Sequence, residues 1–138
     1  VCTTADRAQA DGLDVMGIVR GYSCVGVDPK EMGIGPVPAI KVLLEEAGMT
    51  AGDIDYFEIN EAFSAQYLGC EKELELDRDR CNVNGGAISL GHPLGATGTR
   101  LVLTLLYQLR RSGKKFGVAS ACIGGGQGIA ILVENPAA

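Results

Sequence analysis

Strand-like and helical patterns alternate along this chain, and that alternation limits the possible folds more than any other feature. Short apolar runs rich in β-branched residues indicate strands, whereas apolar residues three or four positions apart indicate helices. Five strands are expected, at Val15–Val27, Ile54–Ile59, Asn82–Ser89, Phe116–Ala121 and Ile129–Val133. Three helices are expected between them, at Pro36–Ala47, Glu61–Leu74 and Ala96–Arg111.

The resulting order, β-α-β-α-β-α-β-β, predicts the α/β class, with a five-stranded mixed sheet covered by helices. A short link joins the last two strands, so this pair is expected to be antiparallel. Residues 1–14 show no clear element and begin with Val1 rather than Met. We interpret residues 1–14 as the remnant of a preceding domain and residues 15–138 as one domain.

The helix expected at Ala96–Arg111 is apolar around most of its circumference. At about 100° per residue, only Thr104 and Gln108 mark a polar strip between Leu101 and Leu109. A helix of this kind is buried on several sides, whereas a helix covering a lone sheet exposes one full face. The pattern therefore predicts a second layer of protein over this helix, from another domain or subunit. Tight packing of the helix in a dimer is the alternative.

Charge and cysteine usage exclude several classes of function. The net charge of −5 argues against electrostatic binding to nucleic acid or to an anionic membrane. The five cysteines include no C-x-x-C pair, and there is one histidine, so we expect no metal site and no disulfide framework. We see no membrane span and no signal segment, and expect a reducing compartment rather than secretion.

Three short segments each lie at the C-terminal end of a predicted strand, where open α/β sheets bind their ligands. They are Asn60–Phe63 (NEAF), Gly91–Gly95 (GHPLG) and Cys122–Gly128 (CIGGGQG). Each has an ordinary structural explanation as well. Asn60 can cap a helix, His92 can be an exposed turn residue, and Cys122 can be an inert buried thiol. The glycines after Cys122 can form a tight hairpin or aim N–H groups at a developing oxyanion.

Taken together, the segments are far more specific than any one alone. Five motifs occur in order: MGIGPVPA from Met32, NEAF from Asn60, NGGA from Asn84, GHPLG from Gly91 and CIGGGQG from Cys122. This series resembles the C-terminal half of thiolases, closest to mitochondrial-type and bacterial 3-ketoacyl-CoA thiolases or acetyl-CoA acetyltransferases. The resemblance extends from about Val15 onward.

The resemblance implies roles for particular residues in ping-pong acyl transfer. Cys122 would be the acid/base that moves the α-proton of the acetyl thioester, and His92 would activate a nucleophilic cysteine. Asn60 would hold a water that, with His92, stabilises the enolate oxygen. The N–H of Gly124 would complete a second oxyanion hole.

The resemblance also implies how the substrate and the rest of the enzyme take part. Ala62 and Phe63 would line the acyl or pantetheine channel, and no cofactor is needed beyond the CoA thioester. The family's nucleophile lies in the N-terminal half, for which this chain has no segment, so we expect the chain alone to be inactive. Expected partners are acyl-CoA or CoA and the missing half, in a homo-oligomer in the cytoplasm or mitochondrial matrix.

Two other functions stay open at this stage. Cys122, His92 and Asn60 are the residue types of a papain-like hydrolase, although their order and glycine-rich settings differ from that family. The chain could also act without catalysis, as a stand-alone thiolase half that binds acyl-CoA or a partner chain.

Overall fold

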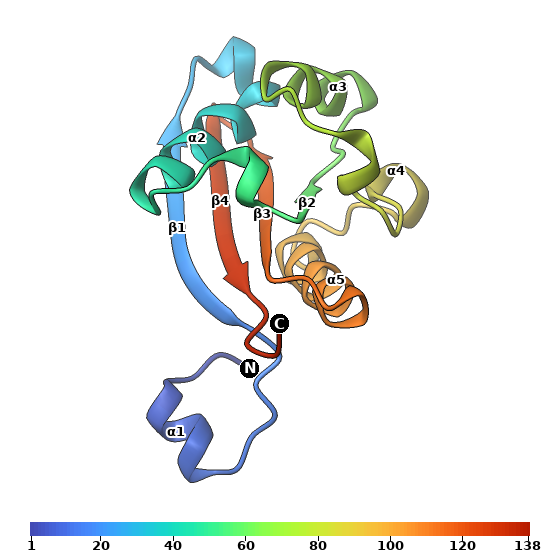
Figure 1. Cartoon of the computed structure of the whole chain (residues 1–138). Helices are drawn as coiled ribbons and strands as arrows, with labels where there is room; N and C mark the ends of the chain where they lie inside the picture. Colours follow the sequence, from blue (N-terminus) through green and yellow to red (C-terminus); the bar gives the residue numbers. More distant parts are fainter.

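A single four-stranded sheet organises the protein, which a computed structural model describes over all residues 1–138. The strands are β1 (Ile18–Gly26), β2 (Tyr56–Ile59), β3 (Phe116–Ile123) and β4 (Gln127–Glu134). Their order across the sheet is β1-β4-β3-β2, as Figure 1 shows. The last two strands pair antiparallel and β2 pairs parallel with β3, so the sheet is mixed, as expected.

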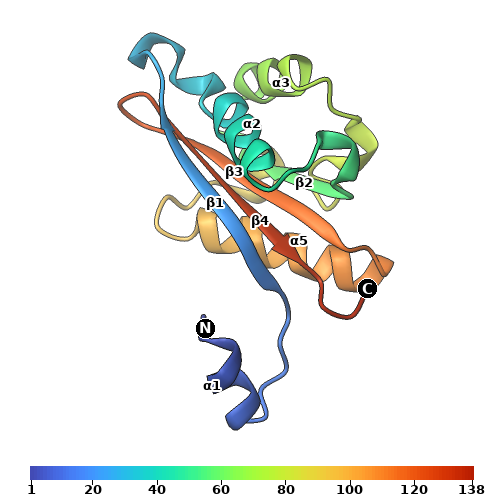
Figure 2. The ribbon, with the colours of Figure 1, turned by 60° about the vertical axis from the view of Figure 1, so that its left-hand side comes forward.

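Helices cover both faces of this sheet. Helices α2 (Pro36–Glu46) and α3 (Ser64–Glu73) lie on one side, and α5 (Thr97–Ser112) lies alone on the other (Figure 2). Short elements complete the chain: α1 (Ala5–Ala10), α4 (Ala87–Leu90) and the 3₁₀ turns η1 (Pro29–Ile34), η2 (Ala51–Asp53) and η3 (Arg78–Arg80). None of the helices combines the length and apolar character needed to span a bilayer.

Successive residues of β3 enter different cores, because side chains of a strand alternate between its two faces. Val118 joins the larger core, which includes Ile40 and Leu43 of α2. Ala119 joins the smaller core with Leu101, Leu105 and Leu109, which form one stripe of α5. The two cores clamp β3 between helices and fix the strand end that carries Cys122.

The outward face of α5 carries two large apolar side chains that nothing in this chain covers. Leu103 is 40% exposed and Tyr107 is 56% exposed, while Leu105 between them is fully buried. This distribution matches the sequence pattern, which left no broad polar face on the helix. No element of residues 1–138 supplies the second layer that the pattern predicts.

The strand expected at Asn82–Ser89 is wrong, and the sheet has four strands instead of five. Asn82 adopts a left-handed backbone (φ 47°), which breaks an extended run. Its side-chain amide takes the place of a neighbouring strand: Oδ1 accepts from the Ile59 N–H, and Nδ2 donates to the Ile59 carbonyl, both at 2.9 Å. At Ile59 the edge of β2 is therefore closed by a side chain, while at Phe57 a backbone bridge to Cys81 closes it.

The first fourteen residues are more ordered than the sequence suggested. They contain the six-residue helix α1, capped by the Thr4 hydroxyl, which stands away from the sheet in Figures 1 and 2. Asp14 then forms an ion pair with Arg110 at 2.9 Å, which ties the start of the main body to the end of α5.

Candidate active site

The site forms where β2 and β3 end side by side. The Asn60 N–H donates to the Ser120 carbonyl at 2.9 Å, which extends the parallel pairing by one residue. Asn60 is 1% exposed and does not cap a helix, since α3 begins only at Ser64. The helix-cap interpretation of Asn60 is therefore wrong, and its amide is available to the site.

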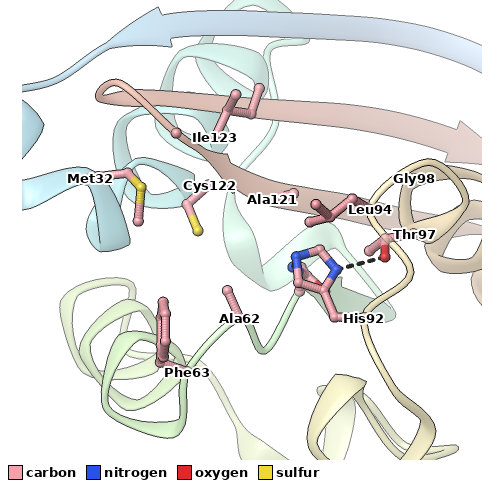
Figure 3. A pocket seen from close by; sticks show the side chains of 12 residues that line it. Met32, Ala62, Phe63, His92, Leu94, Thr97, Gly98, Ala121, Cys122 and Ile123 are labelled. Carbon is pink, nitrogen blue, oxygen red and sulfur yellow. Dashed lines mark hydrogen bonds between the residues drawn. The ribbon is translucent and has the colours of Figure 1, made fainter.

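A cavity of about 450 Å³ opens at this edge of the sheet. Figure 3 shows side chains from both strand ends, from η1 and from the loop before α5 around it. The lining residues are Met32, Asn60, Ala62, Phe63, His92, Leu94, Thr97, Gly98, Ala121, Cys122, Ile123 and Gly124. All six residues singled out in the sequence are among them, and the volume is in the range of small-ligand sites.

His92 lies between two polar side chains. Its Nε2 is 3.3 Å from Nδ2 of Asn60, and its Nδ1 is 2.7 Å from the hydroxyl of Thr97. No hydrogen bond joins His92 to Cys122. The Cys–His pair that a papain-like hydrolase needs is therefore not formed in this structure.

The Cys122 thiol is half-buried at the end of β3. Burial raises the pKa of this thiol above its ordinary value, so the group is protonated at neutral pH. Beside it, the backbone N–H of Gly124 donates to no group in the protein. A neutral thiol is suited to donating a proton, and an unpaired N–H is suited to donating a hydrogen bond to an oxyanion.

The glycine-rich turn after Cys122 is held by close backbone contacts. Gly126 has a φ of 95°, and a Cβ there would lie 2.5 Å from the Val27 carbonyl oxygen. At Gly128 a Cβ would lie 1.9 Å from the Gly35 carbonyl oxygen. Only glycine allows the turn to pack this closely against the segment between β1 and α2, which fixes the Gly124 N–H beside the cavity.

A buried ion pair lies behind the site. Glu58, two residues before Asn60 on β2, is 2% exposed and accepts from Arg100 of α5 at 3.2 Å. Burial raises the pKa of Glu58 to about 7, and the Glu61 charge adds to the rise, while Arg100 opposes it. Nε and Nη2 of Arg100 and Oδ1 of Asn60 are buried without partners.

Sequence reasoning missed Thr97 and Leu94 as parts of the site. The motif that carries His92 continues into the first turn of α5, so a hydroxyl five residues after the histidine falls within reach of the ring. This spacing at a helix start was the available signal. Leu94 is 84% exposed and offered none beyond its place in the same loop.

The cavity brings together a half-buried thiol, an imidazole between two polar side chains and an unpaired backbone N–H. These groups define a site for acid–base chemistry next to an oxyanion. Comparison with known families agrees with this class. The model of the "Thiolase, C-terminal domain" family matches residues 13–135. The chain therefore belongs to the thiolase family, and the resemblance seen in its motifs is confirmed.

Individual relatives are similar over almost the whole chain. The human mitochondrial 3-ketoacyl-CoA thiolase is 48% identical over 137 residues, covering 99% of this chain and 34% of the relative. The acetyl-CoA acetyltransferase of Chromobacterium violaceum is 50% identical over 133 residues, 96% of this chain and 34% of the relative. The peroxisomal 3-ketoacyl-CoA thiolase 1 of Petunia hybrida is 53% identical, covering 93% of this chain and 28% of the relative.

Solved structures give the same result. The crystal structure of human mitochondrial 3-ketoacyl-CoA thiolase superposes with a TM-score of 0.96 at 49% identity, covering 98% of this chain and 34% of that one. The same human protein has been solved in complex with CoA, and that structure matches with a TM-score of 0.94. The chain spans about a third of the length of these relatives.

Proposed function

We propose that residues 15–138 carry the acid–base half of a thiolase. With a nucleophilic cysteine from outside this chain, they would catalyse thiolysis of 3-ketoacyl-CoA or Claisen condensation of acetyl-CoA. The observation that carries the proposal is the convergence of Cys122, His92, Asn60 and the Gly124 N–H on one cavity. Alone, the chain has no partner for the covalent step and is inactive.

Each group has a defined part in thiolysis. The nucleophilic thiol passes its proton to His92 and attacks the 3-keto carbon of the substrate. The C2–C3 bond then breaks, and its electron pair moves onto the acetyl thioester as an enolate. Cys122 donates its thiol proton to C2, which gives acetyl-CoA and leaves the shortened acyl group on the nucleophile. The Cys122 thiolate then takes the thiol proton of CoA, and the CoA sulfur attacks the acyl group. The nucleophile leaves and recovers its proton from His92, and condensation is the reverse sequence.

Charge stabilisation falls to the donors around the cavity. Asn60, through a water, and His92 would hold the enolate oxygen, and the Gly124 N–H would hold the oxyanion that forms at the attacked carbonyl. Burial supports the role of Cys122, since it keeps the thiol protonated until a carbanion is present. We propose no metal and no organic cofactor beyond the CoA thioester.

The substrate channel is proposed at Ala62 and Phe63. Phe63 lines the cavity yet is 65% exposed, so a large apolar surface stands ready to contact the acyl or pantetheine chain. The crystal structure of the human relative with CoA supports CoA as the ligand class.

The remaining partners and the location follow from the relatives. We propose that residues 1–14 end a preceding domain, that an N-terminal thiolase half covers α5, and that the complete protein is a homo-oligomer. We favour the cytoplasm or mitochondrial matrix, supported by the mitochondrial names among the relatives. The Petunia peroxisomal relative is 53% identical, against 48% for the human mitochondrial one, so a fluorescent fusion of the chain's native gene product is the direct test of location.

A domain chimera tests the proposed reaction. This chain replaces the matching C-terminal third of the human mitochondrial 3-ketoacyl-CoA thiolase, and thiolysis of a 3-ketoacyl-CoA is measured. We expect activity, a loss of about 10²–10⁴-fold in kcat for Cys122→Ala, and no loss for Cys24→Ala, an exposed thiol on β1. A folded chimera without thiolysis overturns the proposal, and CoA binding by such a chimera favours the binding-only alternative.

A further inference from the structure

Thr97 is the first residue of α5 and is 3% exposed. Its hydroxyl oxygen lies 2.7 Å from Nδ1 of His92 and 3.0 Å from the carbonyl oxygen of Pro93. A threonine hydroxyl has one proton to donate, and a carbonyl oxygen can only accept. If the hydroxyl donates to Pro93, then its lone pair receives the proton on Nδ1 of His92.

The other face of the imidazole agrees with this direction. A neutral histidine carries one N–H, so a proton on Nδ1 leaves a lone pair on Nε2. Nε2 is 3.3 Å from Nδ2 of Asn60, and an amide nitrogen is a donor. Each group therefore donates a hydrogen bond to the next: Asn60 donates to His92, His92 to Thr97, and Thr97 to the carbonyl of Pro93.

We propose that Thr97 is a positioning residue that holds His92 as the Nδ1–H tautomer, with the Nε2 lone pair facing the cavity. This inference rests on the proposed function, in which Nε2 takes the proton of the nucleophilic thiol. After that transfer the ring is an imidazolium whose Nδ1–H stays bonded to Thr97, and the Asn60 amide nitrogen, itself a donor, no longer bonds to Nε2. The threonine thus fixes which nitrogen acts as the base without touching the substrate.

The reverse arrangement would need two changes. Thr97 would donate to Nδ1, and the Asn60 amide would turn so that Oδ1 accepts from an Nε2–H. That would leave the Asn60 amide group as a buried donor without a partner in place of the unpartnered Oδ1. Unpaired buried N–H groups are rarer than under-satisfied oxygens, so the Nδ1–H form is favoured. The reverse arrangement would also put a proton where the mechanism needs a base.

The tautomer can be read directly, because His92 is the one histidine of the chain. The 138-residue chain is labelled with ¹⁵N-histidine, and the imidazole nitrogen shifts and their couplings to ring protons are recorded above the midpoint of the ring titration. Thr97→Val keeps the shape and removes the hydroxyl, while Thr97→Ser keeps the hydroxyl. Amide spectra of the same samples check that the fold is retained.

We expect the wild type and Thr97→Ser to show a protonated Nδ1 and an unprotonated Nε2. Thr97→Val should shift toward a protonated Nε2. A wild type with its proton on Nε2, or a folded Thr97→Val with unchanged shifts, overturns the proposal. If Thr97→Val does not fold, the wild-type and Thr97→Ser spectra decide the question by themselves.

Catalysis by the chimera gives a second, separable readout. Thr97→Val should lower kcat by at least about tenfold. The loss should not exceed about 10⁴-fold, which is the effect on kcat of holding a catalytic histidine entirely in the wrong tautomer. The KM for 3-ketoacyl-CoA should stay unchanged, and Thr97→Ser should restore kcat. A wild-type chimera without thiolysis would refute the proposed function but leave the tautomer measurement valid. Equal kcat in Thr97→Val and the wild type would refute the positioning role.

Discussion

Cys122 combines a position at a strand end with partial burial. Its thiol has no charged partner, so desolvation dominates and the pKa rises. A thiol in this state is a poor spontaneous nucleophile but a ready proton donor to a carbanion. The same burial that makes the residue look inert in the sequence is what suits it to acid–base work.

The protonated state of Cys122 can be tested by alkylation. Because the thiolate is the reactive form, the iodoacetamide rate at Cys122 should still be climbing well above about pH 8.5, where a free cysteine is half ionised. Peptide mass spectrometry separates the site from Cys24, which is exposed and serves as the control. A rate at Cys122 that is already at its plateau at neutral pH would contradict the account.

Glu58 should give the protein a pH-dependent stability. Its folded pKa of about 7 lies above the ordinary 4.5, so the folded state binds the proton more tightly than the unfolded state. The stabilisation from this group is fully present below the unfolded pKa and is lost as the pH rises through about 7. Urea unfolding from pH 4.5 to 7.5 should show this slope, and Glu58→Gln should reduce it.

An exposed carboxylate provides the matched control for Glu58. Glu45 lies on the exposed side of α2, and Glu45→Gln should leave the slope as in the wild type. If Glu58→Gln and the wild type have the same pH dependence, the buried carboxyl does not titrate in this range. The opposite charge of Arg100 would then outweigh the desolvation of Glu58.

At the scale of elements, the Ile59 end of the β2 edge depends on one side chain. The Asn82 amide makes both hydrogen bonds to Ile59 that a fifth strand would have made. Asn82→Leu, similar in size but unable to pair, should lower the free energy of unfolding by about 1–3 kcal/mol per unsatisfied backbone group. Asn84→Leu, at an exposed position of the same loop, should cost little. Equal losses for both would contradict this account.

The same residue explains why one element could not be predicted. Asn82–Ser89 contains Val83 and Ile88 and looks like a short strand, but a strand needs extended backbone at Asn82. Whether an asparagine is left-handed depends on the partner that its amide finds, here Ile59, which is distant in the sequence. Strands β2, β3 and β4 and helices α2 and α5 carry their own patterns and were predicted to within a few residues.

The candidate site could likewise be predicted from the sequence only in part. Asn60 and Cys122 could be singled out because they stand at the ends of strands, where sheets bind ligands. His92 could be singled out by its glycine-rich segment, although that segment follows the short helix α4 and not the predicted strand. For Thr97 the sequence offered only its spacing from His92, since the direction of its hydroxyl depends on how the loop from Gly91 folds onto α5. Glu58 and Arg100 lie 42 residues apart and meet only when the helix packs on the sheet.

At the scale of the whole molecule, the uncovered face of α5 dominates behaviour in solution. Leu103 and Tyr107 expose apolar surface that the proposed N-terminal half would bury. Without that half, we expect the chain to self-associate in light-scattering chromatography. Replacing Leu103 by Glu and Tyr107 by Lys puts an ion pair at i and i+4 and should give a monomer.

A control variant distinguishes self-association through this face of α5 from non-specific association through any exposed apolar residue. Leu68 on α3 is 49% exposed, comparable to Leu103, but lies on the other side of the sheet. Leu68→Glu should leave self-association unchanged. A wild-type chain that elutes as a stable monomer would contradict the prediction that α5 needs a covering layer.

The central claim is that Cys122 moves the α-proton of an acetyl thioester, and hydrogen exchange measures that step alone. Acetyl-CoA is incubated with the chimera in D₂O, and deuterium entering the acetyl methyl group is followed by mass spectrometry. We predict exchange by the wild type and by Cys24→Ala, with a loss of about 10²-fold or more for Cys122→Ala. Exchange that is equally fast in folded Cys122→Ala would contradict the account and assign the proton transfer to another group.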